Sequence, residues 1–172
     1  MNGLLLWIAQ GFGTGRIALA PGTFGSMVGL LWFALLLLTK NLWLFLGGTA
    51  AGVALSVWVC HVGEKVLGKK DPGSIVFDEL AAIPLCYAAW VIIVFCRTGS
   101  MPAPELFISK GIWPLTLAVF VAFRFFDVLK PWPVRQSQSF HGGLGVTLDD
   151  VLAALYVNVL VVFSYGGSML LP

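Results

Sequence analysis

The chain carries little charge for its length. Only 10% of its 172 residues are charged, and the formal net charge is +2. Water-soluble domains usually contain about a quarter charged residues, so we expect lipid to surround most of this surface. No run rich in Lys or Arg supplies the phosphate attraction that nucleic-acid binding requires. A nucleic-acid partner is therefore excluded, and nothing in the sequence indicates an obligate protein partner.

Cysteine is also scarce. Cys60, Cys86 and Cys96 form an odd set that lies within or at the ends of apolar runs, without metal-ligand spacing. We interpret all three as small buried hydrophobic residues rather than as half-cystines or metal ligands. The first ten residues lack a basic segment and a small-residue cleavage site, so we expect a retained N-terminus and not a signal peptide.

Long apolar runs make up much of the chain. Hydrophobic residues make up 59% of the chain, and the runs cover residues 24–39, 42–60, 80–96, 112–126 and 151–164, with a shorter run at 4–9. Most are slightly shorter than the roughly 20 residues that cross a bilayer core. They lack the alternation of barrel strands. The sequence predicts a single all-α domain over residues 1–172, an integral membrane bundle of about five short spanning helices plus an N-terminal interfacial or partly inserted helix.

Charge is unevenly divided between the two ends of this bundle. Five spans place the connections at 10–27, 61–79 and 127–150 on one side, and these hold seven of the eight acidic residues. The same side has six basic residues against three opposite, with Arg124 left out because it lies within an apolar run. The positive-inside rule predicts that this acidic face is cytoplasmic.

Acidic residues at three helix ends are the strongest functional signal, namely Asp78, Glu79, Asp127, Asp149 and Asp150. Carboxylates beside spanning segments are costly unless they are paired or bound to a cation. Mg²⁺ takes oxygen ligands and is commonly held by a few carboxylates plus substrate phosphate. Alternatively, such acids merely complement the dipole at helix N-termini, but Asp127 follows an apolar run at a helix C-terminus. Glu64 and Asp71 are interpreted as solvated loop acids.

Two glycine-rich segments, at 11–15 and 21–26, lead directly into the first long apolar run. Thr23 or Ser26 could cap that helix and leave backbone N–H groups facing an anion. A phosphate cradle is one interpretation, and close packing is the other. Neither a P-loop nor a dinucleotide-binding pattern is present.

Several cationic or titratable side chains accompany the acids. Arg124, Asp127 and Lys130 are spaced by three residues, so on a helix they share an arc of about 120°. The two cations could clamp a phosphoryl group, or Arg124 could simply pair with Asp127. Arg135 and His141 flank the last polar loop, which we expect to be mobile from its glycines. His141 could protonate a leaving oxygen or hold phosphate, or be structural.

Other phosphatase chemistries find no match in the residues. No Cys is followed six positions later by Arg, and no Asp-x-Asp is present. Arg135 and His141 have the spacing of the type 2 phosphatidic acid phosphatases, but Gly145 stands where that family has Asp. A covalent phosphoenzyme route is therefore disfavoured.

Four blocks taken together resemble the bacterial phosphatidylglycerophosphatase A family. They are the glycine segments at 12–15 and 21–26, residues 71–79 with the first acid pair, residues 123–133 around Asp127, and residues 141–150 with the second acid pair. The resemblance implies a Mg²⁺-dependent phosphomonoesterase of the bacterial inner membrane that converts phosphatidylglycerophosphate to phosphatidylglycerol and inorganic phosphate.

On this hypothesis the five acids hold one or two Mg²⁺ ions, which neutralise the phosphate and activate water. His141 joins them as a catalytic residue, and the remaining phosphate oxygens are bound by Thr23, Ser26, Arg124, Lys130 and Arg135. The competing interpretation is a divalent-cation transporter or channel, whose charges should line a path through the midplane. The centres of the apolar runs are almost free of charge, which favours a site at one face.

Overall fold

The computed structural model describes residues 2–170, with side chains for residues 3–165, and this part of the chain is helical without strands. The helices are α1 (Asn2–Ala9), the 3₁₀ helix η1 (Gly11–Arg16), α2 (Pro21–Leu38), α3 (Leu42–Leu67), α4 (Phe77–Cys86), α5 (Ala88–Thr98), α6 (Pro104–Ile108), α7 (Trp113–Leu129), α8 (Val134–Ser137) and α9 (Gly143–Leu170). The all-α prediction is confirmed.

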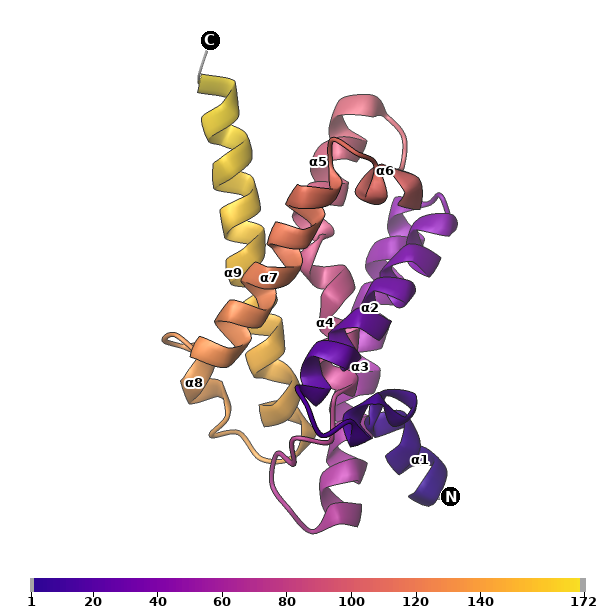
Figure 1. The fold of residues 1–172 in the computed structure, drawn as a ribbon, viewed down its shortest axis with the longest axis vertical. Helices are drawn as coiled ribbons and strands as arrows, with labels where there is room; N and C mark the ends of the chain where they lie inside the picture. Colours follow the sequence, from indigo (N-terminus) through magenta and orange to yellow (C-terminus); the bar gives the residue numbers. More distant parts are fainter. Residues whose placement is uncertain (1, 171–172) are drawn as a thin grey trace.

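The long helices form a bundle in which successive segments run in opposite directions (Figure 1). The N-terminus, η1 and the connections at 68–76 and 130–142 gather at one end, which we call the site end. The turn after α2 and the segment containing α6 lie at the other, the far end. Four segments are long and apolar enough to cross a membrane, Pro21–Leu38, Leu42–Leu67, Phe77–Thr98 and Gly143–Tyr165. The fifth expected spanning segment is helix α7, which has 17 residues and is shorter than these four.

Helix α2 packs against α4 through a stripe of glycines. A Cβ atom added at Gly25 would lie 2.7 Å from Val76 Cβ, and one added at Gly29 would lie 2.7 Å from Ile83 Cγ1. Such small residues let helix backbones approach closely, which is a main source of helix association in membranes. Gly25, in the 21–26 segment, therefore lies in a close helix contact.

One apolar run is broken in the middle. Proline at position 84 removes a backbone N–H from the helix ladder, and α4 ends at Cys86 before α5 begins at Ala88. The carboxamide of Asn158, on α9, contacts this break: Asn158 Nδ2 donates to Leu85 O at 2.7 Å, and Ala89 N donates to Asn158 Oδ1 at 2.7 Å. Hydropathy alone had indicated a continuous helix here.

Helix α3 extends beyond the apolar run that predicted it. The run ends at Cys60, whereas the helix continues to Leu67 and terminates at Gly68, whose φ of 61° is readily adopted by glycine. Glu64 is therefore a buried helical residue whose Oε1 accepts a hydrogen bond from Asp71 N at 2.7 Å, and its assignment as a solvated loop acid was wrong. Cys60 and Cys86 are buried as expected, but Cys96 is exposed.

Candidate active site

The five predicted acids come together at the site end of the bundle. Asp78 and Glu79 lie in the first turn of α4, Asp127 lies in the last turn of α7, and Asp149 and Asp150 follow two turns into α9. The four aspartates are 2–9% exposed. The acids lie close enough to repel one another electrostatically across the helices. A charge on Asp150 is opposed by the charges of Asp127, Asp78, Asp149 and Glu79. So many buried carboxylates need compensating cations.

Arg124 supplies part of this compensation. Its Nη1 lies 2.8 Å from Asp127 Oδ2 and 3.3 Å from Glu79 Oε1, and it donates a longer hydrogen bond of 3.4 Å to Ser26 Oγ. The guanidinium thus joins α7, α4 and α2 at one point. It also offsets the unfavourable position of Asp127 at a helix C-terminus. The ion pair that was the alternative interpretation of Arg124 and Asp127 is therefore present, while Lys130 lies just beyond the helix as its C-cap residue.

Lys130 supplies the second cation. Its Nζ lies 2.6 Å from Asp149 Oδ2, which also accepts a hydrogen bond of 3.0 Å from Gln138 Nε2. Burial lowers the pKa of Lys130, but its hydrogen bond to Asp149 and the charge of that carboxylate raise it more. The pKa therefore lies above its usual value, so the ammonium stays charged near neutral pH.

Gln138 is a site residue that was not predicted from the sequence. Its Nε2 donates to Asp149 Oδ2 and, at 3.2 Å, to Asp71 Oδ2, while its backbone carbonyl accepts a hydrogen bond of 2.9 Å from Lys70 Nζ. It therefore ties the 68–76 connection to the 130–142 connection beside the acids. A neutral amide in a polar loop carries no pattern that would have identified it.

Three carboxylate oxygens are left without a partner. Within the described residues, Asp78 Oδ1, Glu79 Oε2 and Asp150 Oδ1 are buried and accept no hydrogen bond. An unsatisfied buried polar atom is costly, so three of them at the same end of the bundle are unusual. No complete cluster of three or more His, Cys, Asp or Glu ligands is preassembled in this part of the chain. Mg²⁺ keeps several waters and uses few carboxylates, so these residues fit it.

Ser26 does not cap a helix. The N-cap position of α2 is Ala20, which makes no side-chain cap, and Ser26 Oγ instead donates to Gly22 O at 2.9 Å within the helix. The backbone N–H of Thr23 already donates to Ala20 O. The capping role predicted for Thr23 and Ser26 was therefore wrong, although Ser26 does contact Arg124.

Arg135 and His141 are not drawn into the acid network. Both are exposed, and neither side chain makes a hydrogen bond or ion pair with another described residue. The glycines after His141 are closely packed, because a Cβ added at Gly142 or Gly143 would collide with His61 or with the backbone of Val57. His61 was not among the residues singled out from the sequence.

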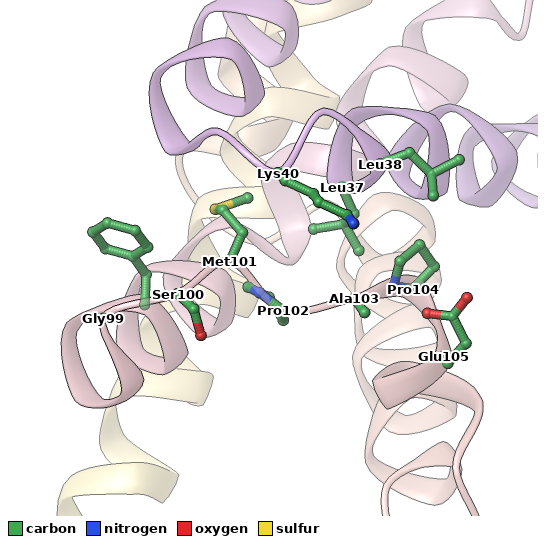
Figure 2. Close-up of a pocket in the computed structure, with 11 residues that line it drawn as sticks. Leu37, Leu38, Lys40, Gly99, Ser100, Met101, Pro102, Ala103, Pro104 and Glu105 are labelled. Carbon is green, nitrogen blue, oxygen red and sulfur yellow. The ribbon is translucent and has the colours of Figure 1, made fainter.

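A cavity of about 480 Å³ opens at the far end of the bundle, between the α2–α3 turn and the segment before α6 (Figure 2). Its charged lining residues are Lys40 and Glu105, and the rest of its wall is mainly apolar, with Leu37, Phe95 and Met101 among it. It contains none of the predicted site residues. The acid cluster at the opposite end therefore remains the candidate active site.

Comparison with known proteins covers almost the whole chain. The family model described as phosphatidylglycerophosphatase A matches residues 7–165. A Haemophilus influenzae protein named phosphatidylglycerophosphatase A is 38% identical over 95% of this chain and 89% of its own, and its Escherichia coli namesake is 31% identical over 86% and 76%. A Bacteroides thetaiotaomicron protein provisionally named phosphatidylinositol-3-phosphatase is 34% identical over 90% and 89%. No solved structure matches the chain.

Proposed function

Since the chain belongs to the phosphatidylglycerophosphatase A family, we propose that it is a membrane phosphatase that hydrolyses phosphatidylglycerophosphate to phosphatidylglycerol and inorganic phosphate with the help of Mg²⁺. The observation that carries the Mg²⁺ proposal is the set of three buried, unpartnered carboxylate oxygens on Asp78, Glu79 and Asp150. Clustered carboxylates beside apolar helices are expected where a divalent cation binds.

The metal would be held by these three acids, with Asp127 and Asp149 completing the set. When bound, Mg²⁺ would supply positive charge to the phosphate oxygens. Asp127 and Asp149 differ from the other three because each has a cationic partner, Arg124 or Lys130. These two cations are also the groups that can attract the phosphomonoester, whose charge they would help to balance.

The reaction forms a bond between phosphorus and a water oxygen and breaks the ester bond between phosphorus and the glycerol oxygen. The leaving oxygen takes up a proton. Hydrogen-bond donors that are fixed before the reaction stabilise charge as it develops, and Arg124 is fixed by contacts to Asp127, Glu79 and Ser26. His141 as proton donor and Arg135 and Thr23 as phosphate ligands stay predictions.

We place the protein in the bacterial inner membrane with its site end facing the cytoplasm. The excess of Lys and Arg at that end supports this orientation. The acids lie where the apolar surfaces of α4 and α9 begin. A phospholipid could therefore keep its acyl chains in the bilayer while its headgroup meets the carboxylates.

A divalent-cation transporter is the alternative function. Transport through the bundle would need polar groups along a path to the far end. Among the described residues, the buried charged side chains are Glu64, Asp78, Asp127, Asp149 and Asp150, and all of them lie at the site end. This distribution favours chemistry at one membrane face.

The proposal is tested by measuring phosphate release from phosphatidylglycerophosphate by purified protein in detergent, with Mg²⁺ or with EDTA. We expect release that requires Mg²⁺ and is lost in Asp78→Asn, whose side chain touches no cation in the structure. Glu105→Gln, at the far end, is the matched acidic control. No release by folded wild-type protein with any divalent metal would reject the phosphatase and favour transport.

The same assay resolves the substrate. Phosphatidic acid and phosphatidylinositol 3-phosphate are offered in parallel, because one relative carries a name that refers to a phosphoinositide. We expect the highest kcat/KM with phosphatidylglycerophosphate. A higher value with the phosphoinositide would keep the phosphatase chemistry and replace the substrate.

A further inference from the structure

The break between α4 and α5 exposes two backbone groups that would bond to each other in a continuous helix. An α-helix pairs the carbonyl of residue i with the N–H of residue i+4, so Leu85 O and Ala89 N are natural partners. In this structure Ala89 N donates to Asn158 Oδ1, and Asn158 Nδ2 donates to Leu85 O, both at 2.7 Å. The carboxamide of Asn158 is inserted into the helix ladder.

This insertion satisfies a strong requirement of the membrane interior. Backbone groups released inside a bilayer must find another partner, because no water is available. Leu85 O also accepts a hydrogen bond from the backbone N–H of Tyr87, whereas Ala89 N depends on Asn158. In the part of the chain that the structure describes, no other side chain hydrogen-bonds to either group. Asn158 is itself held, since Nδ2 also donates to Ala154 O at 2.8 Å within α9. Both polar atoms of the carboxamide, Oδ1 and Nδ2, are therefore held by hydrogen bonds.

The break lies a similar distance from both acid pairs. Along α4, Leu85 follows Glu79 by six residues, and along α9, Asn158 follows Asp150 by eight. Both helices run from the site end toward the far end (Figure 1). They pack through small side chains, with Ala82, Ala153 and Ala154 buried in one core cluster. Small side chains alone specify the axial register of two packed helices weakly. A hydrogen bond between the helices fixes that register.

We infer that Asn158 is a positioning residue for the active site: its carboxamide locks α9 to the α4–α5 break and so holds Asp149 and Asp150 in register with Asp78 and Glu79. This inference rests on the proposed function, because it assigns those carboxylates to one metal site. A shift by one residue would move an acid pair by about 1.5 Å along the helix axis. Displacements of about 1 Å can reduce catalysis by about 10²-fold.

The test compares Asn158→Leu, which keeps the approximate size but removes both hydrogen bonds to the α4–α5 break and the one to Ala154 O, with a matched control. Ser56→Ala removes another buried interhelical bond of α9, the 2.8 Å contact between Ser56 Oγ and Thr147 Oγ1, without affecting α4. We expect both proteins to remain monodisperse in detergent with similar decreases in Tm. Asn158→Leu should lose about 10²-fold in kcat with little change in KM, while Ser56→Ala should retain wild-type kcat.

A conservative variant provides the rescue. The protonated carboxyl of Asn158→Asp keeps one donor and one acceptor in a planar group of the same size, so it should recover most of the kcat that Asn158→Leu loses. Equal kcat losses in Asn158→Leu and Ser56→Ala at equal Tm would overturn the inference, because Asn158 would then be merely structural. Retention of wild-type kcat by Asn158→Leu would do the same.

Two readouts do not depend on hydrolysis. Hydrogen exchange of the Ala89 amide should be faster in Asn158→Leu than in wild type, and the increase in Tm produced by Mg²⁺ should be smaller in Asn158→Leu but unchanged in Ser56→Ala. If wild type hydrolyses none of the offered lipids, the proposed function fails while these two readouts still decide the positioning role. Unchanged exchange and an unchanged Mg²⁺ effect would reject it.

Discussion

At the residue scale, the five acids of the candidate site are not equivalent. Asp127 and Asp149 each contact a cation, whereas Asp78, Glu79 and Asp150 each keep one buried oxygen without a partner. A site assembled for a cation is unfavourable when the cation is missing, since buried like charges repel one another. Substitution of an unpartnered acid should therefore affect stability and activity in opposite directions.

Asp150→Asn tests this opposition. Removal of a buried charge should stabilise the metal-free protein by about 1 kcal/mol, while phosphatase activity falls by about 10²-fold or more. The measurements are Tm in EDTA and phosphate release in Mg²⁺. Glu105→Gln should change neither quantity. A metal-free Tm that drops in Asp150→Asn would show that the carboxylate is satisfied without a cation.

Arg124→Lys should show how much the guanidinium contributes beyond its charge. All of these contacts come from Nη1 at the far end of the guanidinium, and the shorter side chain of Lys would place its ammonium short of that position, away from Glu79 and Ser26. We expect the free energy of unfolding to decrease by about 1–3 kcal/mol and KM to rise. Ser26→Ala, which removes the 3.4 Å contact to Arg124 and the bond within α2 to Gly22 O, should have a smaller effect on both. Wild-type KM in Arg124→Lys would exclude a role in phosphate binding.

At the element scale, the position of α2 depends on its glycines. A Cβ at Gly22 would collide with Glu79 Oε1 and lie 2.9 Å from Arg124 Nη2, whereas a Cβ at Gly47, on α3, would meet nothing within 4 Å. Overpacking in a dense interior typically costs about 1–3 kcal/mol, and replacing an unconstrained helical glycine by alanine gains up to about 1 kcal/mol. The two positions are therefore a matched pair.

We predict that Gly22→Ala lowers both Tm and phosphate release, and that Gly47→Ala raises Tm with normal release. Thermal unfolding in detergent and the phosphate assay measure these effects. The packing account would be contradicted if Gly22→Ala matched Gly47→Ala in both assays.

Hydropathy predicts most elements of this fold, because the apolar runs are helical, although the run at 80–96 is divided between α4 and α5. Hydropathy fails to predict features that involve hydrogen-bond partners distant in the sequence. Asn158, far along the chain, bonds to the backbone at the break near Tyr87, and Glu64 accepts a hydrogen bond from a backbone N–H of the next connection. Neither contact leaves a local pattern. The acids were identified because clustered charge next to apolar runs is itself the signal.

At the scale of the whole molecule, orientation in the membrane is the main prediction still untested. Ser139, in the 130–142 connection, and Ser100, before α6, are exposed at opposite ends of the bundle. Single cysteines at these sites, in a background lacking Cys60, Cys86 and Cys96, report orientation through a membrane-impermeant maleimide applied to intact spheroplasts. We expect Ser100→Cys to react and Ser139→Cys to be protected until the membrane is permeabilised. The reverse labelling pattern would show that the site end faces away from the cytoplasm.

Helix α3 has a further consequence at this scale, because it is longer than a bilayer core is thick. The helix contains 26 residues. At a rise of about 1.5 Å per residue it would extend about 39 Å. The hydrocarbon core of a bilayer is about 30 Å thick. Because the charged residues of α3 lie in its last turns, we expect these turns, which carry Glu64 and lead to Asp71, to project from the lipid beside the carboxylates.

The projecting end of α3 would set the distance of the site from the acyl chains. The site would therefore select substrates by the length of their headgroup. Only a phosphate carried at the matching height reaches the acids while its tails remain in lipid. Water-soluble phosphomonoesters should therefore be poor substrates, however well their phosphate would bind.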